Sequence, residues 1–77
     1  MNHVYKAEIL TSALDARTKE VTEYQVNINN FTLAIEKIGD DPELQEFKSQ
    51  IEDLLASSVF EQRKAQIMLE VIKSQVE

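Results

Sequence analysis

The fold of this chain is decided by one short stretch, Gly39-Asp40-Asp41-Pro42, which holds the only glycine and the only proline of the 77 residues. On each side of it lies a run of more than thirty residues with helical periodicity and no helix breaker. The stretch therefore predicts one long helix, a sharp stop, and a second long helix that turns back along the first.

Each residue of the turn has a local role in this prediction. Gly39 can adopt the left-handed conformation that closes a helix, and Lys37 before it suits the negative end of the helix dipole. Asp41 is a candidate N-cap, and Pro42 fits the first helical position, where no N–H donor is needed. Pro42 also restricts Asp41 to the extended conformation that an N-cap requires.

These signals predict an all-α chain, an antiparallel helical hairpin. It forms a single domain, residues 1–77, with a helix at about 3–38, a turn at 39–41 and a helix at about 42–76. The chain has no cysteine, so neither a disulfide nor a thiolate metal site can stabilise so small a domain.

Apolar and aromatic residues in the first half recur at alternating steps of three and four, the spacing of a coiled-coil seam. Arg17 interrupts this seam, where a polar residue often fixes register or oligomeric state, with Glu20 and Glu61 as candidate partners. Alternatively, Arg17 extends past the edge of the seam and keeps its charge in water. The seam positions are Ala7, Leu10, Leu14, Arg17, Val21, Tyr24, Ile28, Phe31, Ile35 and Ile38.

The apolar pattern of the second half is less regular. The step from Ile51 to Leu55 is typical of a stutter, which relaxes supercoiling locally. Folding the chain at the turn pairs residues whose numbers sum to about 82, so we expect apolar zones at the tip and at the open end, with a polar layer between them. The expected seam runs through Leu44, Phe47, Ile51 and Leu54, and then through Leu55, Ser58, Gln62, Ala65, Leu69, Ile72 and Val76.

Further apolar residues lie outside both seams and make the apolar surface wider than a single hairpin contact needs. The simplest closure is a homodimer with two-fold symmetry, in which two hairpins form an antiparallel four-helix bundle. For the oligomer interface the sequence predicts Ile9, Val26, Leu33, Val59, Phe60, Ile67 and Val71.

Residue types that carry catalysis or bind metals are scarce. The single histidine, His3, lies at the end of a predicted helix. There is no glycine-rich phosphate loop and no Glu-x-x-His pair of the kind found in di-metal bundles. We therefore expect no catalytic residue, no cofactor and no metal ion, and a protein that is not an enzyme.

Negative charge is concentrated around the turn. Residues 36–53 contain seven acidic side chains and two lysines, a net charge of −5, whereas the remaining 59 residues carry −1. These acids serve either as a docking surface for a basic partner, or only as helix N-terminal electrostatics and a source of solubility. The acidic residues are Glu36, Asp40, Asp41, Glu43, Glu46, Glu52 and Asp53.

The net charge of −6 argues against direct contact with nucleic acid or with an anionic membrane. The N-terminal residues lack the apolar core of a signal peptide, so the sequence predicts a cytoplasmic protein. The predicted function is protein–protein interaction by a small homo-oligomeric hairpin, as an adaptor, assembly factor or regulator. The alternative is an acidic decoy of the phage or mobile-element type, which inhibits a host protein by occupying its basic nucleic-acid-binding groove.

Overall fold

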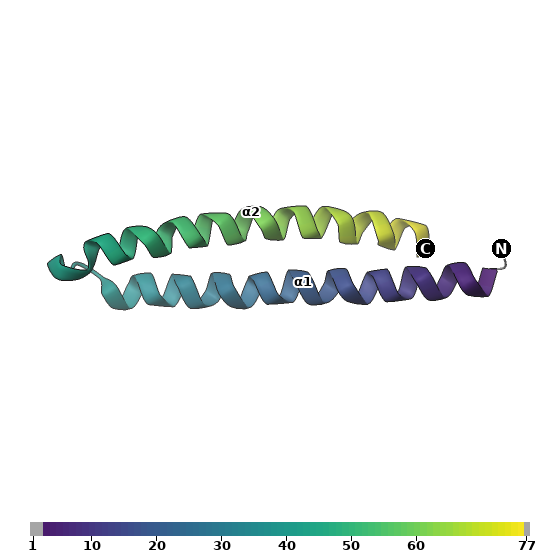
Figure 1. Ribbon diagram of the computed structural model, residues 1–77, viewed down its shortest axis with the longest axis horizontal. Coiled ribbons are helices and arrows are strands. Elements are labelled where there is room, and N and C mark those ends of the chain that lie inside the picture. The colour runs from purple at the N-terminus through teal and green to yellow at the C-terminus, as the bar shows by residue number, and fades with distance from the viewer. Residues whose placement is uncertain (1–2, 77) are drawn as a thin grey trace.

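The computed structural model describes residues 3–76, with side chains from Tyr5 onward, as two long antiparallel helices (Figure 1). Helix α1 spans His3–Ile38, the 3-10 turn η1 spans Pro42–Leu44, and helix α2 spans Gln45–Val76. The all-α helical hairpin is therefore confirmed, and residues 3–76 contain no strand. The expected domain limits at residues 1 and 77 and the side chain of His3 lie outside the described residues.

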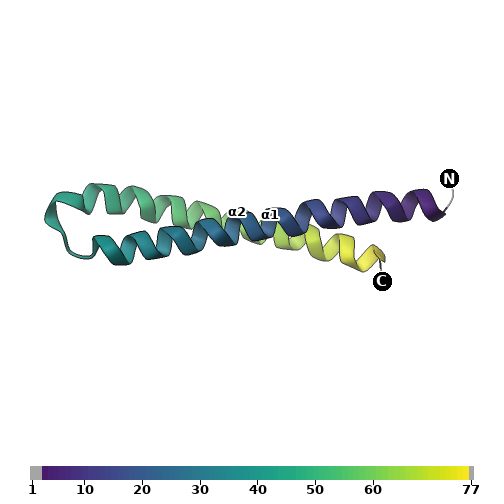
Figure 2. The same ribbon diagram turned by 90° about the horizontal axis from the view of Figure 1, so that it is seen from below.

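The hairpin is a rod. It measures 62 × 16 × 14 Å along its principal axes. Its radius of gyration is 17.7 Å, compared with about 11–12 Å for a compact chain of this length. Figure 2 shows the two helices crossing at a shallow angle near their middles, with the N-terminal end of α1 extending past the end of α2. Each helix therefore packs against one neighbour only, and much of its surface stays in water.

The turn forms as the sequence predicts. Gly39 has φ +52°, in the left-handed region, and its N–H donates to the carbonyl of Ile35 at 3.1 Å. Asp41 lies outside the helical region, with φ −59° and ψ 115°, and its side chain accepts from the N–H of Glu43 at 3.0 Å. The N-cap at Asp41 and the helical position of Pro42 are confirmed, although the chain enters α2 through the tighter turn η1.

Two side chains of α2 complete the turn, and the sequence analysis identified neither of them. Gln45 donates from Nε2 to the carbonyl of Asp41 at 2.8 Å and to that of Gly39 at 3.2 Å. Lys48 donates from Nζ to the same Gly39 carbonyl at 3.0 Å. The Asp41 carbonyl also accepts from the N–H of Leu44, at 3.2 Å. The two side chains therefore supply donors to the carbonyls of the turn, where the backbone hydrogen bonds of the helices are interrupted.

Substituting Gly39 by valine should lower the free energy of unfolding by about 1–2 kcal/mol, because a branched side chain is forced into a left-handed conformation. Space is not the obstacle, since the nearest atom to a Cβ placed there is the carbonyl oxygen of Glu36, at 3.8 Å. Gly39→Asn is the matched control and should lose clearly less, because asparagine tolerates this conformation. Urea denaturation measures both variants, and equal losses would show that the turn does not require a left-handed residue.

The seam of α1 follows the predicted heptad, while the seam of α2 differs near the turn. From Leu10 to Ile38 every predicted position of α1 is buried or half-buried, and only Ala7 at the open end is exposed. The inner seam of α2, which faces α1, alternates by three and four without a break, so the predicted stutter is wrong. It consists of Lys48, Ile51, Leu55, Ser58, Gln62, Ala65, Leu69 and Ile72, with Glu61 half-buried at its edge.

Four residues expected in the seam of α2 lie outside it. Leu44, Phe47 and Leu54 near the turn and Val76 at the open end are all exposed. Lys48 takes the place expected for Phe47, and Leu55 alone takes the place expected for Leu54 and Leu55 together. For the three residues near the turn, the cause is the rotation of α2 about its axis, which the contact with α1 sets. Val76 continues the spacing of the inner seam and is exposed at the open end of the hairpin.

A polar layer crosses the middle of the hairpin, as the sequence predicts. Gln62 is buried and donates from Nε2 to the carbonyl of Val21 at 3.2 Å and to Oε1 of Gln25 at 2.9 Å. Ser58, one turn earlier, is also buried. Gln62 holds the two helices in register, because a shift would leave its amide without acceptors inside the contact.

Candidate functional site

The acidic tip consists of the seven carboxylates around the turn: Glu36, Asp40, Asp41, Glu43, Glu46, Glu52 and Asp53. All seven are exposed. The ion pairs within residues 3–76 join Arg17 to Glu20, Lys19 to Glu23 and Lys64 to Glu61, so none of them involves the acidic tip. The tip therefore presents negative charge that no cation of the described chain neutralises by direct contact.

Three apolar side chains are exposed within the acidic tip. Leu44 is 40% exposed, and Phe47 and Leu54 are each 49% exposed. Phe47 and Leu54 lie seven residues apart, so they share one flank of α2 beside the inner seam. The sequence analysis missed this surface because it assigned all three to the seam. Spacing alone could not have found it, because the series through Phe47 and Leu54 also alternates by three and four as far as Ile72.

The residues predicted as the oligomer interface are all exposed, but they do not form one face. On α1, Ile9, Val26 and Leu33 each lie two residues after a seam position, on the side away from α2. On α2, Phe60, Ile67 and Val71 also lie two residues after a seam position, on the side away from α1. Val59 lies next to the inner seam. One two-fold contact cannot cover all seven residues. The homodimer therefore remains a prediction, and only some of these residues can form its interface.

Arg17 adopts the alternative in which its charge stays in contact with water. Its guanidinium Nη1 lies 2.9 Å from Oε2 of Glu20, and both side chains are more than a third exposed. Glu61 is not its partner, because Glu61 pairs with Lys64 at 2.9 Å. Such a pair contributes at most about 1 kcal/mol. The polar side chain that lies inside the seam is Gln62 instead, and a role of Arg17 and Glu61 in specificity remains a prediction.

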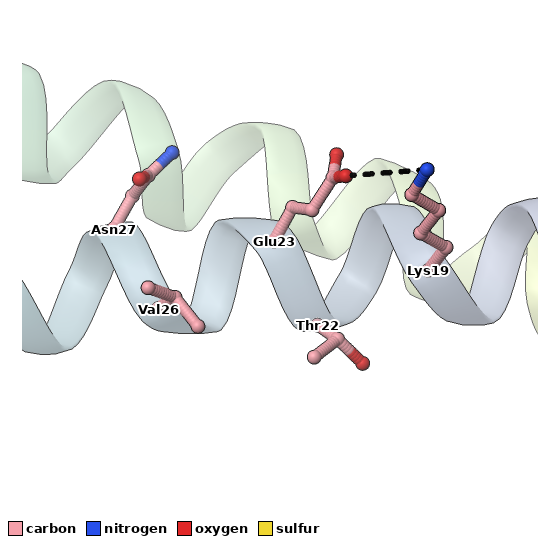
Figure 3. A pocket seen from close by; sticks show the side chains of 5 residues that line it. All are labelled: Lys19, Thr22, Glu23, Val26 and Asn27. Carbon is pink, nitrogen blue, oxygen red and sulfur yellow. Dashed lines mark ion pairs between the residues drawn. The ribbon is translucent and has the colours of Figure 1, made fainter.

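The surface depression shown in Figure 3 does not have the walls of a binding site. The side chains of Lys19, Thr22, Glu23, Val26 and Asn27 line it, and all five project from α1. Lys19 and Glu23 form an exposed ion pair, with 3.9 Å between Nζ and Oε1. A depression formed by one helix has no second element to enclose a ligand.

The described part of the chain offers neither a metal site nor a membrane span. Within residues 3–76, no three His, Asp or Glu side chains are placed so that they could hold a metal ion together. Over the same residues, neither α1 nor α2 has a stretch long and apolar enough to cross a membrane.

Comparison with protein-family models, with curated proteins and with solved structures finds no match to this chain. Its function must therefore be inferred from its own surface. The two features available for that are the acidic tip at one end and the exposed apolar positions along α2.

Proposed function

We propose that this chain is a non-enzymatic protein–protein interaction module. In this proposal it is a homodimeric hairpin that acts as an adaptor, assembly factor or regulator by binding a basic segment of another protein at its acidic tip. The observation that carries the proposal is the exposure of Leu44, Phe47 and Leu54 among seven carboxylates without ion pairs. A cytoplasmic location remains a prediction from the sequence.

The acidic tip offers two kinds of contact that a protein partner would use together. The cations of an amphipathic basic segment would pair with the carboxylates, while its apolar side chains would lie against Phe47 and Leu54. The charges would raise the association rate and orient the partner, and the apolar contact would supply most of the affinity. Because hydrogen bonds from Gln45 and Lys48 already hold the turn, little ordering of the tip would be needed on binding.

An acidic decoy for a nucleic-acid-binding groove is the second candidate, and the charge of the tip favours it. A duplex carries one charge per about 1.7 Å of its axis, so a duplex as long as this 62 Å rod carries about 36 charges. The chain has a net charge of only −6. A decoy also has no use for the exposed Phe47 and Leu54, so the interaction module is the better-supported function.

Affinity capture from the source cells, with the wild-type chain and three variants, tests the proposal. A partner of the proposed kind should be retained by the wild type and the control, and lost by both tip variants. The first variant neutralises part of the tip, the second removes two of its three exposed apolar side chains, and the control neutralises four exposed acids elsewhere. The tip-charge variant is Glu43→Gln/Glu46→Gln/Glu52→Gln/Asp53→Asn. The tip-apolar variant is Phe47→Ser/Leu54→Ser. The control is Glu8→Gln/Asp15→Asn/Glu23→Gln/Glu70→Gln.

The affinity of the captured partner is then measured at about 0.05 M and about 0.5 M salt, because exposed charge pairs weaken as the screening length shortens. A decoy complex would be lost in the tip-charge variant alone, would dissociate at the higher salt, and would be displaced by nucleic acid. Retention of the same proteins by all four chains would show that the acidic tip is not the binding surface.

A further inference from the structure

Helix α2 carries a second apolar seam on the face turned away from α1. This outer seam consists of Ser57, Phe60, Lys64, Ile67, Val71 and Ser74. Its positions alternate by three and four, and each lies two residues after a member of the inner seam, about 200° around the helix. Phe60, Ile67 and Val71 are 57%, 59% and 46% exposed. The hairpin thus buries one seam of α2 and leaves the other in water.

The exposed area of the hairpin is larger than that of an ordinary monomer. The chain exposes 5924 Å², whereas a compact monomer of 8.8 kDa exposes about 4,800 Å². No large side chain among the described residues is fully buried. A standard interface removes about 800 Å² from each partner, so one such contact would bring the chain close to the usual range.

The outer seam is nearly symmetrical about its centre, between residues 65 and 66. In an antiparallel pairing of two α2 helices, Phe60 meets Val71 of the second copy, Lys64 meets Ile67 of the second copy, and serines meet at both ends. Every contact then occurs twice, as a two-fold interface requires. In a parallel pairing, Lys64 of one copy would face Lys64 of the other, and such a like-charge contact is unfavourable.

The acidic tip favours the same antiparallel orientation. A parallel dimer would bring two tips together, each with a net charge of −5 over residues 36–53. In an antiparallel dimer the tips point in opposite directions. They lie about 70 Å apart, because Pro42 is about 23 residues from the centre of the outer seam and a helix rises 1.5 Å per residue.

Lys64 is compatible with a place in this contact. Its Nζ lies 2.9 Å from Oε1 of Glu61 and 4.9 Å from the centre of the Phe60 ring. Its charge therefore already has partners on α2. The aliphatic part of the side chain can pack along the outer seam while the ammonium group stays at the edge in water.

We infer that a second copy of this chain covers the outer seam in an antiparallel two-fold dimer. The inference rests on the homodimer of the proposed function and assigns it a face and an orientation. Because the inner and outer seams lie on opposite faces of α2, the two α2 helices form the centre of a four-helix layer and the α1 helices lie outside. Both acidic tips remain accessible, one at each end of the assembly.

Sedimentation equilibrium of the isolated chain tests the dimer without any binding partner. The wild type should have twice its monomer mass of 8.8 kDa at about 10 µM. Ile67→Lys should weaken association at least about 100-fold, because it places a second cation against Lys64 of the other copy in the centre of the contact. Leu33→Lys is the matched control, since Leu33 is 53% exposed and Ile67 is 59% exposed. It should leave the dimer intact, because Leu33 lies on α1, outside the contact. Circular dichroism checks that both variants remain helical.

Distances between spin labels test the orientation and leave the outer seam unchanged, so they apply even if a charged seam variant does not fold. The chain has no native cysteine, so Ser49→Cys and Gln66→Cys each give one label per copy. The labels at residue 49 should lie about 50 Å apart in the antiparallel dimer and less than about 25 Å apart in a parallel one. The labels at residue 66 should be close in either case and serve as the positive control.

Three outcomes would overturn the inference. The wild type could remain a monomer up to about 100 µM, which would assign the outer seam to a different protein. Leu33→Lys could weaken the dimer as much as Ile67→Lys does, or the residue 49 labels could lie close together. A dimer that binds no partner at its tips would contradict only the binding role of the acidic tip. A monomer whose tip binds a partner would contradict this inference and the homodimer of the proposed function, and would leave the binding role of the tip intact.

Discussion

Substituting Ile51 by aspartate is expected to lower the free energy of unfolding by at least about 3 kcal/mol. Ile51 is 8% exposed and belongs to the inner seam near the turn. The substitution removes apolar burial and places a carboxylate against α1 rather than in water. A chain of this size has a total stability of roughly 4–12 kcal/mol, so this loss removes at least about a quarter of it.

A cation that could neutralise the new carboxylate would have to give up its hydrogen bond in the turn. Among the described seam residues of α2, Lys48 lies three positions before Ile51, and its ammonium already donates to the Gly39 carbonyl at 3.0 Å. The control is Gln50→Asp, which adds the same charge at an exposed neighbour and should change stability by less than about 0.5 kcal/mol. Urea denaturation followed by circular dichroism measures both. A loss below about 1 kcal/mol for Ile51→Asp would contradict the position of Ile51 in the seam.

Replacing Leu55 by alanine should lower the free energy of unfolding by about 2 kcal/mol, whereas replacing Leu54 by alanine should cost less than about 0.5 kcal/mol. Leu55 is half-buried in the inner seam. Leu54 is 49% exposed on the flank of α2. Removing an apolar side chain is costly only where neighbouring atoms surround it and cannot close the space that it leaves.

The two leucine variants control for each other. They change the same residue type at adjacent positions of one helix, so the small difference in helix propensity between leucine and alanine cancels. The difference between them therefore reports how α2 is rotated relative to α1. Both variants are measured at equal chain concentration. If Leu54→Ala lowers the free energy of unfolding more than Leu55→Ala does, Leu54 lies in the seam and the predicted stutter is present.

The sequence by itself determined the turn and the presence of one long helix on each side of it. Gly39, Asp41 and Pro42 act through their own backbone conformation and through hydrogen bonds to residues within one helical turn, so no long-range contact is needed to specify them. The seam of α1 was equally predictable, because a single three–four series runs without competition from Leu10 to Ile38. The concentration of acids around the turn follows from the sequence as well.

Only the tertiary structure decided how α2 is rotated about its axis. Near the turn, one series passes through Phe47 and Leu54 and another passes through Lys48 and Leu55, and both include Ile51. Near the turn, hydrophobicity favours the first series. Packing along the whole helix selects the second, in which Gln62 and Leu69 face α1 where the first series would place Glu61 and Met68. Lys48 is tolerated there because its ammonium reaches the carbonyl of Gly39. The same rotation exposes Phe47 and Leu54 beside the acidic tip, which is why this candidate site emerged from the packing of the helices and not from the pattern of residues.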